Sequence, residues 1–128
     1  MSPDDLVAAA REAALKAYAP YSGFRVGAAV LADDGRVFTG ANVENSAYPS
    51  SSCAEATAVA HAASEGMRRI TATAVACIDA ASIEGAYPCG RCRQILSEFD
   101  TETVYVTAAS GEVRTHTLVE LLPHGFKL

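Results

Sequence analysis

The stretch TATAVACID, residues 71–79, decides the fold. It alternates small, β-branched and apolar residues and carries no charge until its last position, which is typical of a strand buried in the middle of a sheet. The alanine-rich stretch before it, residues 53–64, predicts a helix, because alanine is the best helix former. Ser51 or Ser52 is expected to cap that helix, and Gly66 to close it.

The segments around this predicted helix and strand complete a mixed pattern of helices and strands. Apolar residues at steps of three and four predict an N-terminal helix that Ser2 or Asp4 caps and Pro20 ends. The turn Asp33-Asp34-Gly35 between two segments rich in Val and Phe predicts a hairpin. The expected elements are helices over residues 4–18, 53–64, 89–99 and 118–122 and strands over residues 26–32, 36–43, 71–79 and 103–108. This order predicts a single α/β domain over residues 1–128, with a mixed sheet between helices.

Length and charge exclude several classes of protein. The chain has 128 residues, of which 50% are hydrophobic and 20% charged, as expected for one globular domain. A chain of this size can bury a sufficient core without a disulfide or a structural metal, so any metal site favours a functional interpretation. Ten Lys and Arg against 15 Asp and Glu give a net charge of −5, the wrong sign for binding a phosphate backbone. No nucleic-acid polymer is expected as a partner.

No apolar stretch reaches the roughly 18 to 20 residues of a membrane span, and the first turn is acidic rather than basic. We therefore expect no membrane partner and a cytoplasmic location. The four cysteines are then reduced thiols, and such thiols usually serve metal or redox chemistry.

Three of the cysteines form a pattern with one glutamate. Cys53-Ala54-Glu55 opens one predicted helix, and Pro88-Cys89-Gly90-Arg91-Cys92 opens another. Two thiolates one helical turn apart point the same way, and Cys53 offers a third ligand, which leaves the fourth tetrahedral position of Zn²⁺ open for water. Glu55, two residues beyond a ligand, is placed to move protons at that position.

Other interpretations of these residues stay open. The pair Cys89 and Cys92 alone would fit a redox couple or half of a structural zinc site, and the whole domain could be a non-catalytic zinc or thiol protein. Cys77 lies within the buried-strand pattern and is expected to be a core residue. The three histidines lack a partner at ligand spacing and are expected to have surface or packing roles; they are His61, His116 and His124.

The order Cys-x-Glu followed by Pro-Cys-x-x-Cys is the pattern of the zinc deaminases. Beyond it, nearly the whole chain resembles the small homotetrameric cytidine deaminases; the matching segments are residues 21–29, 42–45 with 48–49, 64–66, 88–94 and 121–123 with Phe126. The resemblance implies a three-layer α/β/α fold with a mixed five-stranded sheet and one Zn²⁺ per chain. It also implies hydrolysis of cytidine and 2'-deoxycytidine to uridine and 2'-deoxyuridine with release of ammonia.

The resemblance also implies roles for single residues. Glu55 is the catalytic residue, and Cys53, Cys89 and Cys92 are the metal ligands. The substrate-binding residues are Phe24 against the base, the backbone of Ala54 at the pyrimidine carbonyl, and Asn42 and Glu44 at the ribose hydroxyls.

A homotetramer with shared pockets is the expected assembly. Phe126 resembles the C-terminal aromatic residue that enters a neighbouring subunit's pocket in the family, and Tyr48 is expected to play a similar intersubunit part. The chain departs from many members at Ala56, where they carry an arginine that donates to the thiolates. Arg91, between two ligands, is our candidate to compensate the thiolate charge instead.

Two related activities compete with this interpretation. The blasticidin S deaminases also resemble the Cys-Ala-Glu and Pro-Cys-Gly-Arg-Cys motifs and act on an antibiotic cytosine nucleoside. Asn42, Glu44 and the Phe24 segment favour an ordinary nucleoside. A polynucleotide editor is disfavoured by a short acidic chain without a basic groove.

Overall fold

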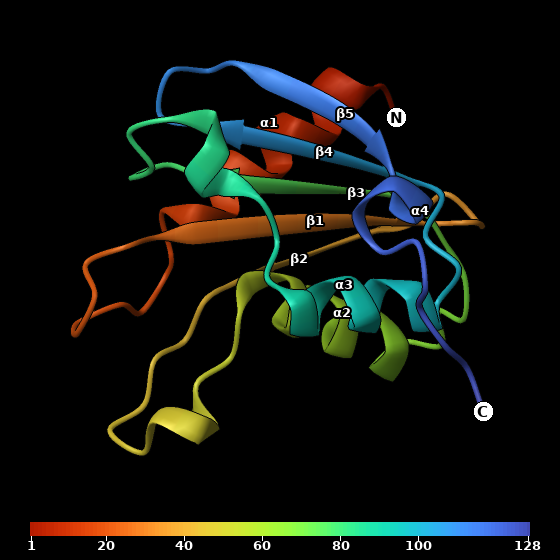
Figure 1. The fold of residues 1–128 in the computed structure, drawn as a ribbon, viewed down its shortest axis with the longest axis horizontal. Coiled ribbons are helices and arrows are strands. Elements are labelled where there is room, and N and C mark those ends of the chain that lie inside the picture. The colour runs from red at the N-terminus through yellow and green to blue at the C-terminus, as the bar shows by residue number, and fades with distance from the viewer.

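A five-stranded mixed sheet runs through the middle of the molecule, in the order β2-β1-β3-β4-β5 (Figure 1). The computed structural model describes residues 1–128. The strands are β1 (Val26–Ala32), β2 (Val37–Ala41), β3 (Ile70–Cys77), β4 (Thr103–Ala108) and β5 (Val113–Thr117). Only β3 and β4 are parallel, and the other neighbours are antiparallel. The predicted mixed sheet of five strands is confirmed.

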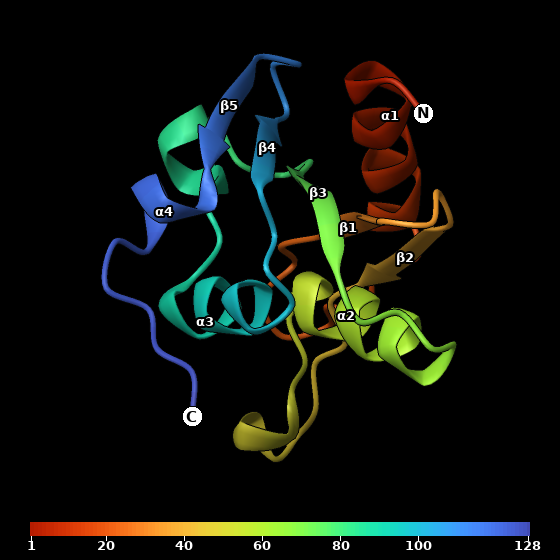
Figure 2. The ribbon, with the colours of Figure 1, turned by 90° about the vertical axis from the view of Figure 1, so that its right-hand side faces the viewer.

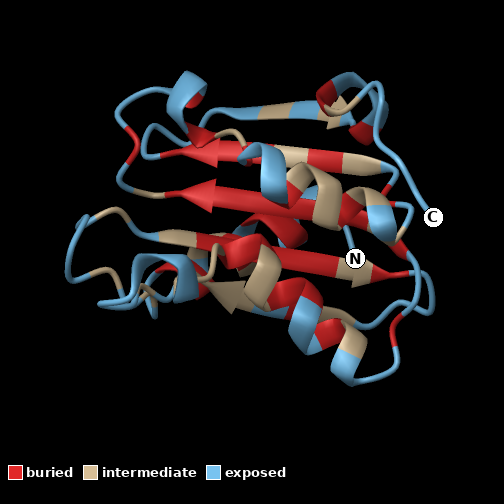
Figure 3. Cartoon of the chain, turned by 60° about the horizontal axis from the view of Figure 1, so that its bottom comes forward, coloured by how far each residue is buried: buried red, intermediate tan, exposed pale blue.

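The central strand is β3, as its apolar pattern predicts. Seven of its eight residues are buried, and Figure 3 shows the middle strands as the most buried part of the sheet. A parallel neighbour needs a crossover connection, and helix α3 (Gly90–Glu98) lies in the connection from β3 to β4. The segment that carries Cys89 and Cys92 therefore lies in the crossover between β3 and β4.

Helices cover both faces of the sheet and make three layers (Figure 2). Helix α1 (Pro3–Ala14) packs on one face over a small core of seven buried residues, five of them alanines. Helix α2 (Ala54–Ser64) and α3 pack on the other face, over a core of 21 buried residues. The short helix α4 (Leu118–Leu121) follows β5, and two 3-10 turns span Tyr48–Ser50 and Ile83–Ala86. No helix has the length and apolar character needed to cross a membrane.

Glycine and alanine let the helices lie unusually close to the sheet. A Cβ atom at Gly40 of β2 would lie 2.4 Å from the backbone nitrogen of Ala58 in α2. At Gly27 of β1, it would lie 2.0 Å from the carbonyl oxygen of Ala10 in α1. Both distances are far below van der Waals contact, so these two glycines set the height of the helices above the sheet.

The start of α1 matches the prediction and its end does not. Ser2 caps the helix, and its hydroxyl and the carboxylate of Asp5 form a reciprocal capping box. The helix ends at Ala14 rather than at Tyr18. The backbone nitrogen of Tyr18 donates to the carbonyl of Asn42 at 2.9 Å, a strand-like bridge that replaces the expected helical hydrogen bond.

Two further details differ from the sequence prediction. Strand β5 was not expected from the pattern, because its alternation is polar and it lies at an exposed edge. The N-cap of α2 is Cys53, whose side chain makes no capping hydrogen bond. Ser51 and Ser52 are not caps because their hydroxyls bind the Asn45 backbone and the Thr57 side chain instead.

Candidate functional site

Three thiols meet where α2 and α3 begin side by side. Cys53 and Cys89 are the N-caps of the two helices, and Cys92 lies in the first turn of α3. Their sulfur atoms all lie within 4.8 Å of one another, and Cys53 Sγ and Cys89 Sγ are 3.9 Å apart. None of them is in a disulfide. The structure thus brings together the three cysteines that the sequence predicts as ligands.

The surroundings of the cluster favour the thiolate form of Cys53. The pKa of Cys53 is lowered to about 6, first because Cys92 donates a hydrogen bond to it, and also by Cys89 and the positive charge of Arg91. The pKa of Cys92 is raised by its bond to Cys53 and by burial. Thiolate is the form that binds metal, and a set of three soft sulfur ligands at two helix N-termini suits zinc. The residues present therefore fit a zinc ion.

A buried carboxyl group lies next to this cluster. Glu55, in the first turn of α2, is only 4% exposed. Burial, together with the neighbouring Cys53, raises the pKa of Glu55 to about 7. A carboxyl group with such a pKa can both accept and release a proton near neutral pH.

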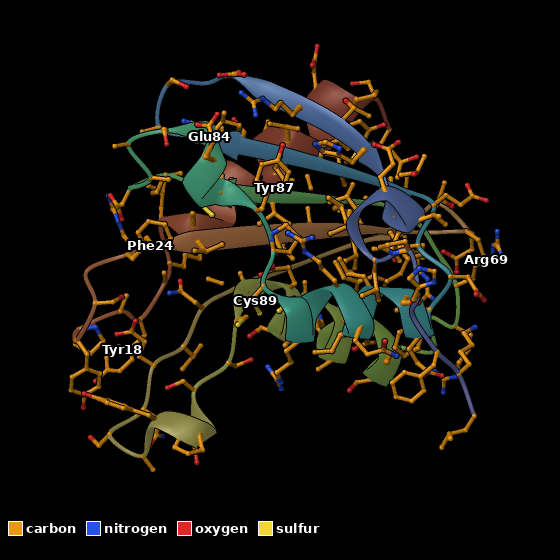
Figure 4. All side chains as sticks on the ribbon, viewed as in Figure 1. Tyr18, Phe24, Arg69, Glu84, Tyr87 and Cys89 are labelled. Carbon is orange, nitrogen blue, oxygen red and sulfur yellow. The ribbon has the colours of Figure 1, made fainter.

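The cluster opens into a cavity of about 330 Å³, large enough for a small organic molecule. Its walls come from segments far apart in the chain, and Figure 4 labels three of these residues, Phe24, Tyr87 and Cys89. Seven residues singled out from the sequence line this cavity: Phe24, Asn42, Glu44, Cys53, Ala54, Glu55 and Cys89.

Asn42 and Glu44 are hydrogen-bonded to the segment that carries Phe24. The Asn42 side chain accepts a hydrogen bond from the Val26 backbone at 2.9 Å and donates one to the Phe24 carbonyl at 2.8 Å. The Glu44 carboxylate accepts from the backbone nitrogens of Tyr21 and Ser22 and from the Ser22 hydroxyl. The Ser22 hydroxyl is the main cause that lowers the pKa of Glu44. Both side chains therefore shape the wall that carries Phe24.

Besides the buried Cys92, three candidate residues lie outside the lining of the cavity. Phe126 is 67% exposed, and its backbone carbonyl accepts a hydrogen bond from Gln94. Tyr48 is 73% exposed and borders a neighbouring shallow groove, where its ring meets the ring of Tyr21 edge-on at 6.2 Å. Arg91 is exposed at the start of α3, close enough to Cys53 to affect its pKa.

Cys77 is a buried core residue that also contributes to the cavity wall. It is 3% exposed, as the buried-strand pattern predicts, yet it also borders the cavity. Burial raises the pKa of the Cys77 thiol to about 12, so it stays protonated.

Sequence reasoning missed Tyr87 as a cavity residue. Its position directly before Pro88 and Cys89 is the one signal that could have identified it. The histidines lie outside the thiol cluster: His61 contacts the Thr39 carbonyl, and His116 lies between Tyr87 and Glu120.

Comparisons with known proteins agree with this geometry. Residues 2–108 match the family model described as the cytidine and deoxycytidylate deaminase zinc-binding region. A cytidine deaminase of Sporosarcina psychrophila is 44% identical over 98% of this chain and 92% of its own. One of Mycobacterium tuberculosis H37Rv is 45% identical over 93% of this chain and 85% of its own. The crystal structure of cytidine deaminase from Burkholderia pseudomallei is similar with a TM-score of 0.91 and 42% identity, covering 98% of this chain and all of that one.

Proposed function

The chain belongs to the cytidine and deoxycytidylate deaminase family, and we propose that it hydrolyses cytidine and 2'-deoxycytidine to uridine and 2'-deoxyuridine with release of ammonia. The observation that carries this assignment is the cluster of three thiols and the buried Glu55 carboxyl at one cavity of nucleoside size. A structural zinc site would not need a buried carboxyl group beside it, facing a cavity.

Zinc is the cofactor, with one ion per chain, and Cys53, Cys89 and Cys92 would hold it. When bound, zinc supplies a Lewis acid that lowers the pKa of water at its open position. The burial of Cys92 and the placement of two ligands at helix N-termini support a site in which the sulfurs are held before the metal arrives.

Glu55 is the catalytic residue of this proposal. Its carboxylate takes a proton from the water that adds to C4 of the cytosine ring and places that proton on N3. It then passes the second proton of that water to the departing amino nitrogen, so that the carbonyl forms as ammonia leaves. The burial of Glu55 excludes bulk water from these transfers.

Four lining residues are proposed to bind the nucleoside. Phe24 lies against the base, and the backbone of Ala54 contacts the pyrimidine carbonyl. Asn42 uses one of its two amide hydrogens on the Phe24 carbonyl, which leaves one for a ribose hydroxyl. Glu44 is held ionised by its hydrogen bonds and keeps free lone pairs that can accept from a second hydroxyl.

Arg91 is proposed to compensate the charge of the ligands. Three thiolates and one Zn²⁺ carry a net charge of −1, which weakens the effect of the metal on water. Alanine at position 56 offers no charge, whereas the positive charge of Arg91 acts on Cys53. The exposed position of Arg91 leaves its guanidinium free to turn toward the sulfurs.

We further propose that residues 1–128 form one catalytic domain that assembles as a homotetramer. The exposure of Phe126 and Tyr48 supports an assembly that covers these rings and completes each pocket from a neighbouring subunit. The substrate is a small nucleoside, not a nucleic-acid polymer. Reduced thiol ligands favour the cytoplasm, where this reaction would serve pyrimidine salvage.

The test is conversion of cytidine by the purified protein, with bound zinc counted and a chelator-treated, zinc-restored sample alongside. Glu55→Gln should abolish conversion while zinc content and melting temperature stay unchanged. Conversion that continues in Glu55→Gln would refute the role of this carboxyl. A zinc-loaded protein that is inert on cytidine and deoxycytidine would transfer the assignment to a modified nucleoside, with blasticidin S tested next.

A further inference from the structure

An ion pair holds the cavity wall from outside the cavity. Arg25 lies between the two lining residues Phe24 and Val26, but it does not border the cavity itself. Its Nε and Nη2 atoms donate to the two carboxylate oxygens of Asp79, at 2.9 and 3.0 Å. The backbone nitrogen of Arg25 also donates to Asp79, at 2.9 Å. Asp79 thus fixes both the side chain and the main chain of residue 25.

The wall itself has no regular structure to hold it. Residues 21–25 precede β1 and belong to no helix or strand. Apart from Gly23, which donates to the Ala19 carbonyl, their backbone groups bind side chains. Tyr21 and Ser22 bind Glu44, Phe24 binds Ser22 and Asn42, and Arg25 binds Asp79. Of these four side chains, only Asp79 lies outside the lining of the cavity.

The position of Asp79 follows from the register of the sheet. Val26 at the start of β1 pairs with Cys77 at the end of antiparallel β3, so the residues just beyond both ends meet at the cavity. The hydrogen bonds from Arg25 lower the pKa of Asp79 to about 2. The carboxylate therefore stays ionised in the neutral range.

We propose that Asp79 is a positioning residue for the substrate, which holds Phe24 against the base through its three hydrogen bonds to Arg25. The inference rests on the proposed function, because it concerns the same pocket. Ser22, Asn42 and Glu44 can exchange bonds with a bound nucleoside, whereas Asp79 holds the wall whether or not substrate is present.

The expected effect is on binding rather than on chemistry. A wall that contacts the base equally in the ground state and the transition state affects KM and leaves kcat unchanged. Exposed ion pairs add little to global stability, and Arg25 and Asp79 are 44% and 28% exposed. Removal of the pair should therefore leave the protein folded.

The chain offers a matched control. Asp34 binds the backbone nitrogen and the Nε atom of Arg36, at 3.0 and 2.8 Å. Arg36 is about as exposed as Arg25, and Asp34, at 50%, is more exposed than Asp79. It lies in the hairpin turn at the opposite end of β1, roughly 20 Å along the strand from the cavity. Asp34→Asn removes the same kind of pair without touching the wall.

The experiment compares Asp79→Asn, Asp79→Glu and Asp34→Asn with the wild type. Asp79→Asn should raise KM for cytidine by about threefold to tenfold with kcat within about twofold, Asp79→Glu should recover part of the loss, and Asp34→Asn should match the wild type. Hydrogen exchange of a peptide over residues 21–26 should be faster in Asp79→Asn and unchanged in Asp34→Asn.

Two results would overturn the proposal: an unchanged KM in Asp79→Asn, or equal effects of Asp79→Asn and Asp34→Asn. If the wild type does not convert cytidine, the proposed function fails instead. Binding of uridine and hydrogen exchange then still decide whether Asp79 positions the wall.

Discussion

Helix α2 lies so close to the sheet at Gly40 that a larger residue there should disturb both the fold and the candidate site. In Gly40→Ala, the new Cβ atom would lie 2.4 Å from the Ala58 nitrogen and 2.9 Å from the Thr57 carbonyl carbon. Ordinary contact begins near 3.4 Å, so α2 must move away from β2 by about 1 Å. The atoms in the way are backbone, which cannot rotate aside as a side chain can.

The cost can be given for both stability and activity. Overpacking of this kind destabilises a core by about 1–3 kcal/mol, which for a domain of this size lowers the melting temperature by roughly 4–12 °C. The same helix begins with Ala54 and Glu55, next to the proposed ligand Cys53. A displacement of about 1 Å at catalytic groups can reduce turnover about 100-fold.

The assays are thermal unfolding, zinc content, and kcat/KM for cytidine. Gly85→Ala is the stability control, because its added methyl group would meet only Ala80 Cβ, at 3.8 Å, and should change the unfolding free energy by less than about 0.5 kcal/mol. A Gly40→Ala variant that melts like the wild type and turns over cytidine within a few-fold would show that α2 is free to shift, contrary to the packing described.

Three further predictions concern single side chains. Arg91→Ala should lower kcat/KM by about fivefold to tenfold, a loss of about 1 kcal/mol of charge stabilisation, and should weaken zinc binding measured by competition with a chelator; unchanged kinetics would leave the helix N-termini as the compensating charge. Thr73→Val should raise the unfolding free energy in urea by about 1 kcal/mol, because the Thr73 hydroxyl is fully buried without a partner; a loss of stability would indicate that it has one. In Arg25→Ala, the pKa of Asp79 followed by carboxyl NMR should rise from about 2 toward its ordinary value of about 3.9. Because the folded pKa is the lower one, the ion pair stabilises the fold above about pH 4 and is lost as pH falls toward 2; an unchanged titration would mean that another group holds the carboxylate.

The parts of this molecule that sequence predicts well are those with a local pattern. The central strand can be predicted because its residues are apolar on both faces. The thiol cluster can be predicted because Cys53, Cys89 and Cys92 lie at helix starts in short motifs. Strand β5 is not visible in this way, because an exposed edge strand needs no apolar side chains. The number of strands and the roles of Phe24, Asn42 and Glu44 came from family resemblance; the strand number is confirmed, and these roles stay predictions.

The contacts that the sequence could not predict depend on register. Arg25 and Asp79 are 54 residues apart and meet only because Val26 pairs with Cys77. Helix α1 ends at Ala14 rather than at Tyr18 because Tyr18 forms a strand-like bridge with Val43. This partner, too, is distant in the sequence. Pairings of this kind depend on the assembled sheet, which no local pattern encodes.

The parallel pairing of β3 with β4 has a consequence for the order of events during synthesis. Strands β1, β2 and β3 can pair as soon as residue 77 has left the ribosome, because β1 is antiparallel to both of its neighbours. Cys89, Cys92 and β4 emerge only later, so at that stage Cys53 would be the only one of the three ligands available. Since a domain generally folds as a unit, the complete sheet and the thiol cluster can form only after β4 has emerged. Zinc binding by all three thiols is therefore a late event in the synthesis of the chain.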